Sequence, residues 1–208
     1  MIELLAVFGD DLTVVNAARV SFSKESTKID EADEKLIKYL AKNNHITPFF
    51  HPQLRFRIKM PIFLAREWFR HQIGFSRNEV SRRYVDSVPE CWLPTEFRER
   101  NPNVKQGSSD HEVENSKYLH KIVENHTEGC VSLYRHLLNQ NVAPEIARCI
   151  LPQSMMTEFI ETGSLSAYAR LYKLRKDPHA QKEIQEYATK IGKLIEEKFP
   201  LSWKALTT

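Results

Sequence analysis

The stretch that decides the fold reads QLRFRIKMPIFLAREWFRHQIGFSRNEVSRRY, residues 53–84. Its first part, Gln53 to Met60, alternates between apolar and mostly basic side chains, and this period of two predicts a strand with one buried face. The proline that follows suits the first turn of a helix, which is predicted to run to about His71. The residues from Phe75 to Glu79 are then predicted to form a loop that faces a ligand.

The part of this stretch from Arg66 to Tyr84 contains five arginines and no lysine. The arginines are Arg66, Arg70, Arg77, Arg82 and Arg83. Arginine presents a rigid fork of donors that suits phosphate groups. Asn78, Glu79 and Ser81 add the neutral donors and acceptors that recognise a heterocycle and a sugar. The pattern therefore predicts a site for a phosphorylated small molecule, with a solvated basic helix and loop as the alternative.

Length and composition indicate one domain, residues 1–208, and 41% of the residues are hydrophobic, which is enough for a sizeable core. No apolar run approaches the ~20 residues that a membrane span needs, and the N-terminus does not resemble a signal peptide. The formal net charge of +3 argues against wholesale nucleic-acid binding. The three cysteines are far apart and odd in number, which favours a reducing, cytoplasmic location.

Periodicity predicts further strands at 2–8 and 155–161. Helices are predicted at about 10–20, 30–42, 110–139, 143–152, from Ser164, and at 177–198. Strands and helices that do not alternate strictly indicate the α+β class. The apolar stripe of the helix at 110–139 is predicted to face the core, with His126 and Cys130 as core side chains. Two other histidines, His45 and His51, flank a turn but have no acidic or cysteine partner nearby, so we predict no metal site.

The arginine-rich stretch also resembles a family signature. The residues Arg70-His71-Gln72, Asn78-Glu79, Ser81 and Arg83-Tyr84 are similar to the motif of the flavin-dependent thymidylate synthases, the ThyX family. That motif is Arg-His-Arg, a short spacer and Ser, with Asn-Glu before the Ser and Arg-Tyr soon after it. Two positions depart from the pattern, because Gln72 stands where the family usually has Arg and Glu67 where many members have Gln.

A second resemblance lies late in the chain, in Gly163-Ser164-Leu165, Leu174-Arg175 and His179-Ala180-Gln181. The two signatures in this order imply the ThyX fold, a central and mostly antiparallel sheet with several helices. They also imply a homotetramer with its sites at subunit interfaces. The implied reaction makes dTMP from dUMP, with carbon from 5,10-methylenetetrahydrofolate and a hydride from FAD that NADPH has reduced.

The resemblance also assigns residues to ligands. The residues implied to contact dUMP are Glu67, Trp68, Phe69, Arg70, Glu79, Val80, Ser81, Arg82, Arg83, Arg148 and Arg175. The residues implied to contact FAD are Thr47, Arg70, His71, Gln72, Glu79, Ser164, Leu165, Ser166 and Arg170. The candidate catalytic residues are Arg175, His71 and Ser81.

Within this set, Arg83 and Arg148 are expected to hold the nucleotide phosphate and Arg175 the uracil edge. His71 and Gln72 are expected to lie against the flavin. Ser81 is expected to bind rather than attack, and no cysteine lies in a basic stretch that would activate it as a nucleophile. Two alternatives stay open, a nucleic-acid binder and a nucleotide- or flavin-binding paralogue without synthase activity.

Overall fold

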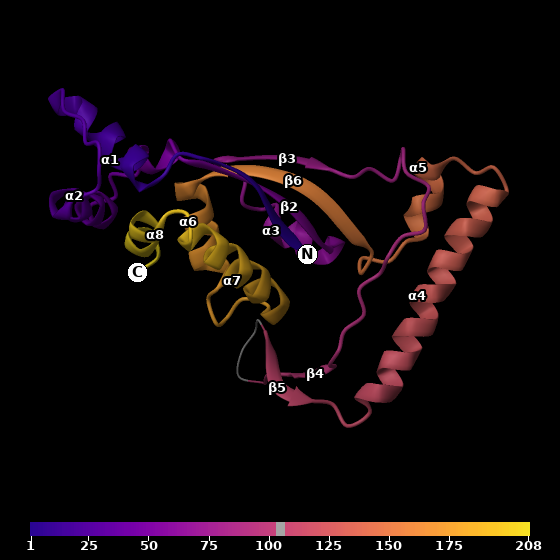
Figure 1. Ribbon diagram of the computed structural model, residues 1–208. Coiled ribbons are helices and arrows are strands. Elements are labelled where there is room, and N and C mark those ends of the chain that lie inside the picture. The colour runs from indigo at the N-terminus through magenta and orange to yellow at the C-terminus, as the bar shows by residue number, and fades with distance from the viewer. Residues whose placement is uncertain (103–106) are drawn as a thin grey trace. The chain divides into compact units, whose positions relative to one another are not determined.

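The computed structural model describes residues 1–102 and 107–208 and has an α+β fold, as expected (Figure 1). The chain divides into two compact units. Unit 1 comprises Met1–Ile58, His71–Asn78 and Ile160–Thr208, and unit 2 comprises Lys59–Arg70 and Glu79–Phe159. That residues 1–208 form one domain stays a prediction.

The main sheet has four strands in the order β1-β2-β6-β3. Their bounds are Ile2–Phe8 for β1, Gln53–Pro61 for β2, Phe75–Glu79 for β3 and Met156–Ser164 for β6. Strand β1 pairs antiparallel to β2, with Ile2 opposite Ile58. The predicted strand at 53–60 is confirmed, because its apolar residues all point inward: Leu54, Phe56, Ile58 and Met60 are fully buried. Basic side chains alternate with these apolar ones, so one face of the strand is buried and the basic side chains lie on the other face.

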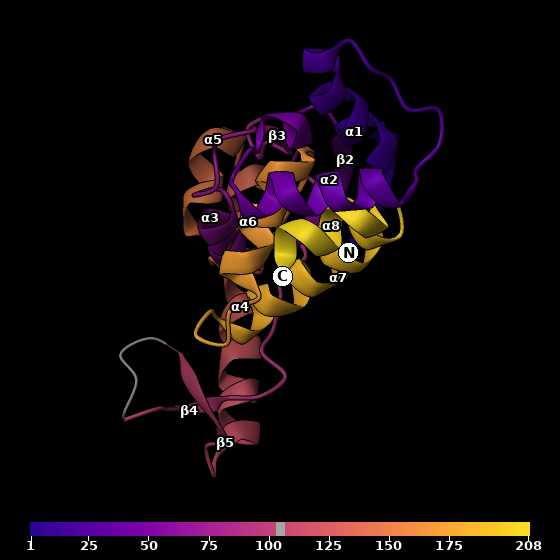
Figure 2. The same cartoon turned by 90° about the vertical axis from the view of Figure 1, so that its left-hand side faces the viewer.

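Unit 1 carries the helices α1, Asp11–Arg19, α2, Glu31–Lys42, α6, Leu165–Arg175, α7, Lys182–Glu196, and α8, Pro200–Thr207. It also carries the short 3-10 helices η1, Val20–Phe22, and η2, Thr47–Phe50. Helices α1 and α2 begin close to the predicted positions, and Asp10 and Asp30 cap them, since each carboxylate accepts a hydrogen bond from the backbone three residues on. Helix α8 packs on α2 and α6, and Figure 2 shows it beside α2.

The end of the chain differs from the prediction in two ways. The last predicted helix begins at Lys182 instead of Asp177, because the Asp177 side chain accepts a hydrogen bond from the backbone of His179 in a turn. Helix α8 was missed. It follows the buried Phe199, begins with a proline and buries Trp203. It is thus a short amphipathic helix directly after α7.

Unit 2 carries α3, Ile62–Trp68, α4, Ser116–Asn139, α5, Pro144–Ala147, the 3-10 helix η3, Arg148–Ile150, and the strands β4, Arg98–Arg100, and β5, Ser108–Glu112. The prediction that a helix starts at Asp110 is wrong, because Asp110 lies in β5, which pairs antiparallel with β4. The predicted helix after Pro61 ends three residues early, at Trp68. Arg66 therefore lies in the helix, whereas Arg70 lies beyond its end.

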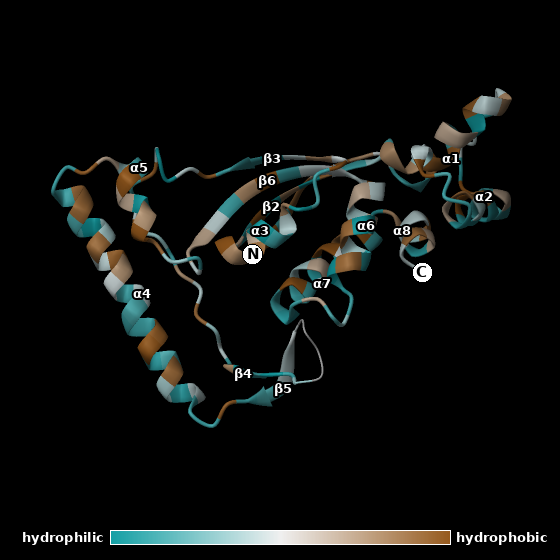
Figure 3. Ribbon diagram, turned by 180° about the vertical axis from the view of Figure 1, so that it is seen from behind, coloured by the Kyte–Doolittle hydropathy of each residue, from teal (hydrophilic) through white to brown (hydrophobic). Residues whose placement is uncertain are grey.

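Helix α4 also contradicts the prediction that its apolar stripe faces the core. Its buried residues are Ser116, Thr127 and Tyr134, whereas Ile122 and Leu133 are each 46% exposed. His126 is exposed, and its Nε2 lies 3.7 Å from Sγ of Cys130. Figure 3 shows hydrophobic segments recurring along this helix. The stripe exists, but in the single chain much of it faces outward.

No helix in the described ranges is long and apolar enough to cross a membrane.

Candidate functional site

The sequence-predicted site residues fall in both units, and each set is described by itself. Unit 1 holds Thr47, His71, Gln72, Ser164, Leu165, Ser166, Arg170 and Arg175. Unit 2 holds Glu67, Trp68, Phe69, Arg70, Glu79, Val80, Ser81, Arg82, Arg83 and Arg148.

In unit 1 the two predicted catalytic residues His71 and Arg175 meet. Nε of Arg175 donates a hydrogen bond to Nε2 of His71 at 2.9 Å, and the histidine is only 8% exposed. A guanidinium has no acceptor, so the bonded imidazole nitrogen carries no proton. His71 is therefore a neutral imidazole in this contact, with its proton on Nδ1.

The segment after His71 is fastened to the start of α6. The backbone of Ser164 donates to the carbonyl of Gly74 at 3.1 Å, and Arg170 donates to the carbonyl of Ile73 at 2.6 Å. Gly74 has φ +83, and a Cβ there would lie 2.8 Å from Cβ of Ala167. Glycine thus permits both the turn and the close approach. The structure thereby brings the predicted flavin residues of 71–72 and 164–170 to one place.

These residues differ in what they can offer to a ligand. Ser164 is buried and its hydroxyl caps α6 by accepting from the backbone of Ala167 at 3.2 Å. Leu165 is fully buried, and its backbone donates to the carbonyl of Pro52. Ser166 is half-buried and Arg170 exposed, and both line a cavity of about 960 Å³ between α2, α6 and α8. Thr47 begins η2, which packs against α6.

The residues 75–79, predicted to form a ligand-facing loop, are strand β3, so that prediction is wrong. The reason is tertiary pairing. Arg77 forms an ion pair through Nε with Glu161 on β6, whose side chain is fully buried, and the Arg77 side chain is only 14% exposed. Its guanidinium also lies 4.7 Å from the ring centroid of Phe75. Arg77 is thus part of the core and does not extend into a ligand loop.

Tyr168 on α6 packs beside this ion pair. Its ring meets that of Phe75 edge-on at 4.9 Å. Burial, and then the nearby carboxylate of Glu161, raise the pKa of the Tyr168 hydroxyl well above its usual range. The tyrosine therefore stays protonated.

In unit 2, hydrogen bonds hold the predicted nucleotide residues that follow β3. The hydroxyl of Thr157 donates to the carboxylate of Glu79 at 2.5 Å. The backbone of Val80 donates to the carbonyl of Glu158 at 2.9 Å. Both partners belong to β6, so a rigid strand positions Glu79 and Val80.

The two arginines predicted to bind phosphate meet at one acidic residue. Nε of Arg83 lies 3.4 Å from a carboxylate oxygen of Glu145, and Nε of Arg148 donates to the Glu145 carbonyl at 3.3 Å. The side chains of Arg83 and Glu145 are about half exposed. The Glu145 carboxylate is therefore the anionic partner of Arg83, while Arg148 contacts the backbone of the same residue.

Ser81 and Arg82 shape the turn beside this pair. The Ser81 hydroxyl accepts from the backbone of Arg83 at 3.3 Å, and Arg82 donates to the carbonyl of Ser87. In the described part of the chain no histidine bonds to Ser81, so nothing there activates it as a nucleophile.

Fewer side chains of the segment 67–70 are accessible to a ligand than predicted. Trp68 is fully buried, and the ring of Phe69 packs edge-on against that of Phe159 at 4.8 Å. Arg66 donates to the side chain of Gln153 at 3.4 Å, which adds a partner not seen in the sequence. Arg70 is exposed, and Glu67 is half-buried.

Sequence reasoning missed Glu145, Thr157 and Glu161, the acceptors and donors that hold the predicted arginines and Glu79. Glu145 lies three positions before Arg148, and this spacing in a short helix was the only local signal for it. Thr157 and Glu161 alternate inward along β6, but their partners lie 78 and 84 residues away.

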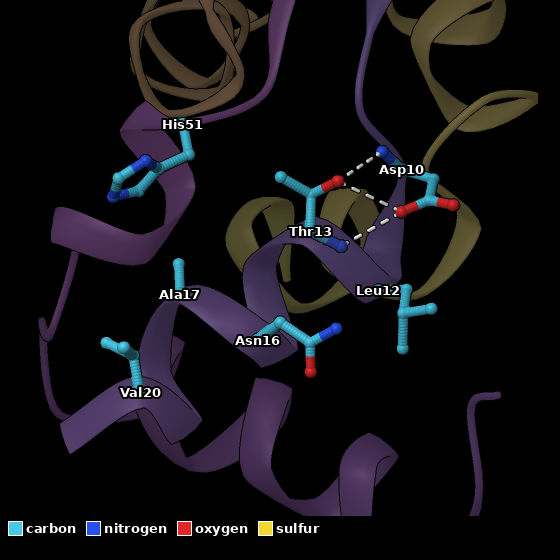
Figure 4. Close-up of a pocket in the computed structure, with 7 residues that line it drawn as sticks. All are labelled: Asp10, Leu12, Thr13, Asn16, Ala17, Val20 and His51. Atoms are coloured by element: carbon cyan, nitrogen blue, oxygen red, sulfur yellow. Dashed lines mark hydrogen bonds between the residues drawn. The ribbon is translucent and has the colours of Figure 1, made fainter. Parts of the chain in front are cut away.

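The two histidines that flank the turn at 45–51 have different surroundings. His51 lines a cavity of about 530 Å³ with the first turns of α1, where Asp10 and Thr13 bond to each other in a capping box (Figure 4). The ring of His45 meets that of Tyr39 edge-on at 5.9 Å. Within residues 1–102 and 107–208, no three His, Cys, Asp or Glu side chains cluster so that they could hold a metal ion.

The chain is similar to known proteins over nearly its whole length. The family model described as thymidylate synthase complementing protein matches residues 3–201. A flavin-dependent thymidylate synthase of Thermosipho melanesiensis is 40% identical over 205 residues, which cover 98% of this chain and 89% of that protein. A flavin-dependent thymidylate synthase of Thermus thermophilus is also 40% identical, over 98% of this chain and 74% of that protein.

A solved structure is similar as well. It is the UMP/dUMP methylase PolB of Streptomyces cacaoi bound with 5-Br dUMP. It is 28% identical with a TM-score of 0.89, and the match covers 100% of this chain and 94% of that one. The fold similarity therefore extends over the whole chain.

Proposed function

We propose that this chain, which belongs to the thymidylate synthase complementing protein family, methylates dUMP to dTMP. Its relatives include flavin-dependent thymidylate synthases. In this proposal FAD is the flavin, NADPH its reductant and 5,10-methylenetetrahydrofolate the carbon donor. The observation that carries the proposal is the contact of Arg175 with His71, because it joins the two signature segments in one site.

The donor chemistry of unit 1 fits a flavin dinucleotide. Arg170 offers an exposed cation, Ser166 a hydroxyl and Gln72 an exposed amide, which are donors for phosphates and ring carbonyls. When bound, FAD supplies the hydride that completes the methyl group. The chain itself holds the neutral imidazole of His71 in a fixed orientation against Arg175.

Arg175 is proposed to bind the uracil edge. Its guanidinium has five N–H donors in one plane, so it can contact His71 and a pyrimidine oxygen together. Positive charge at that oxygen stabilises negative charge that develops on the ring and makes the ring carbon a better nucleophile. No side chain needs to attack the substrate, which agrees with the binding role proposed for Ser81.

Arg83 and Arg148 are proposed to hold the nucleotide phosphate. Both already lie at Glu145, so a phosphate dianion would replace one anionic partner of Arg83 by another. Charge-assisted bonds from arginine to phosphate are stronger than those between neutral groups.

We also propose a homotetramer with sites at the subunit interfaces and a cytoplasmic location. The exposed apolar residues of α4 and α5, among them Ile122, Leu133 and Ile146, support assembly, because a stripe of this kind on a soluble protein marks a contact surface. Analytical ultracentrifugation should give four chains per particle. A monomer at micromolar concentration would contradict this part of the proposal.

The experiment that tests the function starts with the visible spectrum of the purified protein after FAD is added. NADPH oxidation is then followed with and without dUMP, and dTMP is measured after methylenetetrahydrofolate is supplied. The expected result is bound flavin, oxidation that responds to dUMP, and dTMP. No flavin binding at saturating FAD would overturn the proposal, and flavin binding without dTMP would favour a paralogue without synthase activity.

A further inference from the structure

Thr157 is a polar residue in the inward-facing row of β6. It is 3% exposed, and Phe159, the next residue of that row, is 1% exposed. A buried hydroxyl is unfavourable unless it forms a hydrogen bond, and a valine would fill nearly the same space without this requirement. The Thr157 hydroxyl meets the requirement by donating to Oε1 of Glu79 at 2.5 Å, across 78 residues of sequence. Thr157 therefore contributes a directed contact that an apolar residue at this position could not make.

Glu79 is an exposed residue, and this contact holds its carboxylate by one oxygen. A hydroxyl bonded to an ionised carboxylate forms a short and strong hydrogen bond, so it restricts the rotamers of a side chain that would otherwise be mobile. In the part of the chain that the structure describes, no hydrogen bond or ion pair engages Oε2 of Glu79. One oxygen of Glu79 is thus anchored, and the other is an acceptor of defined direction.

The backbone around this contact is held on both sides of Thr157. The amide of Met156 donates to the carbonyl of Glu90 at 2.7 Å, and the amide of Val80 donates to the carbonyl of Glu158 at 2.9 Å. These bonds keep the hydroxyl within reach of the carboxylate. If the hydrogen bond between the two side chains served only to satisfy a buried hydroxyl, its loss would alter stability and not ligand binding.

We propose that Thr157 is a positioning residue of the reaction, which acts by directing the second carboxylate oxygen of Glu79 towards a hydrogen-bond donor of the nucleotide. The inference rests on the function proposed above and on the implied contact between Glu79 and dUMP. A carboxylate repels the phosphate of dUMP, which Arg83 and Arg148 are proposed to hold, so the donor belongs to the sugar or the uracil ring. Thr157 itself touches no reacting atom, and its hydroxyl keeps its proton.

The test compares Thr157→Val with Thr157→Ser. Valine keeps the size and branching of the side chain but removes the donor, so the carboxylate of Glu79 is no longer oriented. In Thr157→Val the Kd for dUMP should rise roughly fivefold, and kcat/KM for dUMP should fall by at least the same factor, because a hydrogen bond to a charged group is lost. Calorimetric titration of the FAD-loaded protein measures the Kd, and dTMP formation measures kcat/KM. Thr157→Ser keeps the donor, so both constants should stay close to those of the wild type.

A double-mutant cycle with Glu79→Ala shows whether Thr157 acts through the carboxylate. When the acceptor is absent, Thr157→Val should cause no further loss of affinity for dUMP, so the effects of the two changes should not add. The matched control is Thr189→Val on α7, which removes a hydroxyl that donates to the carbonyl of Gln185 in the same helix. It should leave the Kd and kcat/KM for dUMP unchanged.

Wild-type values of Kd and kcat/KM in a folded Thr157→Val protein would overturn the inference. So would equal losses in Thr157→Val and Thr157→Ser, additive effects in the cycle, or a changed Kd for FAD with an unchanged Kd for dUMP. If Thr157→Val does not fold, Thr157→Ala and Thr157→Ser differ in the hydroxyl alone and permit the same comparison. If the wild type forms no dTMP, the proposed function fails, whereas the Kd values for dUMP still decide the role of Thr157.

Discussion

Nε of Arg175 lies 2.9 Å from Nε2 of His71, across 104 residues of sequence. The contact joins the end of α6 to the segment that leads into β3, and it fixes the tautomer of the imidazole because arginine only donates. The imidazole of His71 is thereby held in a defined orientation. A change at either residue therefore alters the surroundings of the other.

Replacing Arg175 by lysine should therefore damage catalysis more than folding. Lysine keeps the charge but not the planar fork, so it cannot hold His71 and also make the proposed contact with the uracil edge, and kcat/KM for dUMP should fall at least roughly tenfold. Steady-state dTMP formation measures this. Arg135→Lys, on the exposed side of α4, is the matched control and should be neutral. An unchanged kcat/KM in Arg175→Lys would show that the contact is only structural.

The contact between Arg83 and Glu145 predicts opposite effects of two substitutions on dUMP affinity. Arg83→Gln removes the proposed charged contact with the phosphate and should raise the Kd for dUMP roughly tenfold. Glu145→Gln removes a competing anion at an exposed ion pair, so the Kd should fall about twofold to threefold. Calorimetric titration with dUMP measures both, with Glu186→Gln on α7 as the control. Weaker dUMP binding in Glu145→Gln would mean that the carboxylate organises the arginines instead of competing with the phosphate.

The departure at Gln72 predicts a weak flavin site that a single change should strengthen. Gln72 is exposed, so arginine fits there without repacking and adds a cation for the flavin or its phosphates. Gln72→Arg should lower the Kd for FAD roughly fivefold in a fluorescence titration. Gln72→Glu has a similar size and the opposite charge, and it should raise the Kd. The same Kd in all three proteins would place the FAD phosphates elsewhere.

A buried carboxylate of unit 1 should make stability depend on pH. Burial alone would raise the pKa of Asp33, but hydrogen bonds from Arg19, from the backbone of Asp30 and from Ser26 outweigh it and hold the pKa below its usual 3.8. A lowered pKa in the folded state stabilises the protein above the unfolded pKa, and this stabilisation is lost as pH falls through the folded value.

The free energy of unfolding should therefore decrease as pH falls from about 5 to about 3, and Asp33→Asn should be less stable at pH 7 with a flatter profile. Urea unfolding at several pH values measures both effects. The exposed Asp86→Asn is the control and should retain the wild-type slope. Parallel profiles for the wild type and Asp33→Asn would refute this origin of the acid sensitivity.

Local patterns predicted the elements that carry their own signal. The alternation at 53–60 predicts β2 because one face must be buried, and aspartates near 10 and 30 predict helix starts because such carboxylates bond to nearby backbone. Strand β3 could not be predicted this way. Its polar residues resemble a loop, and only pairing in the sheet and the distant Glu161 make it a strand.

The candidate site shows the same difference between residues with a local sequence signal and contacts with distant residues. The resemblance to the two signatures named the arginines, but no local pattern indicates that Arg83 shares Glu145 with Arg148 or that Glu79 bonds to Thr157. The outward face of α4 was also missed, because periodicity reports an apolar stripe and not what covers it.

The buried pair of Arg77 and Glu161 has a consequence for how the sequence can change. Removing either partner alone leaves a charge in the core without its counterion, at a cost of about 3–5 kcal/mol, whereas replacing both by apolar residues of similar volume can be neutral. In natural relatives and in random libraries, these two positions should therefore be substituted together or not at all. The exposed Arg83 and Glu145 carry no such constraint from folding, so any covariation between them would report selection on ligand binding.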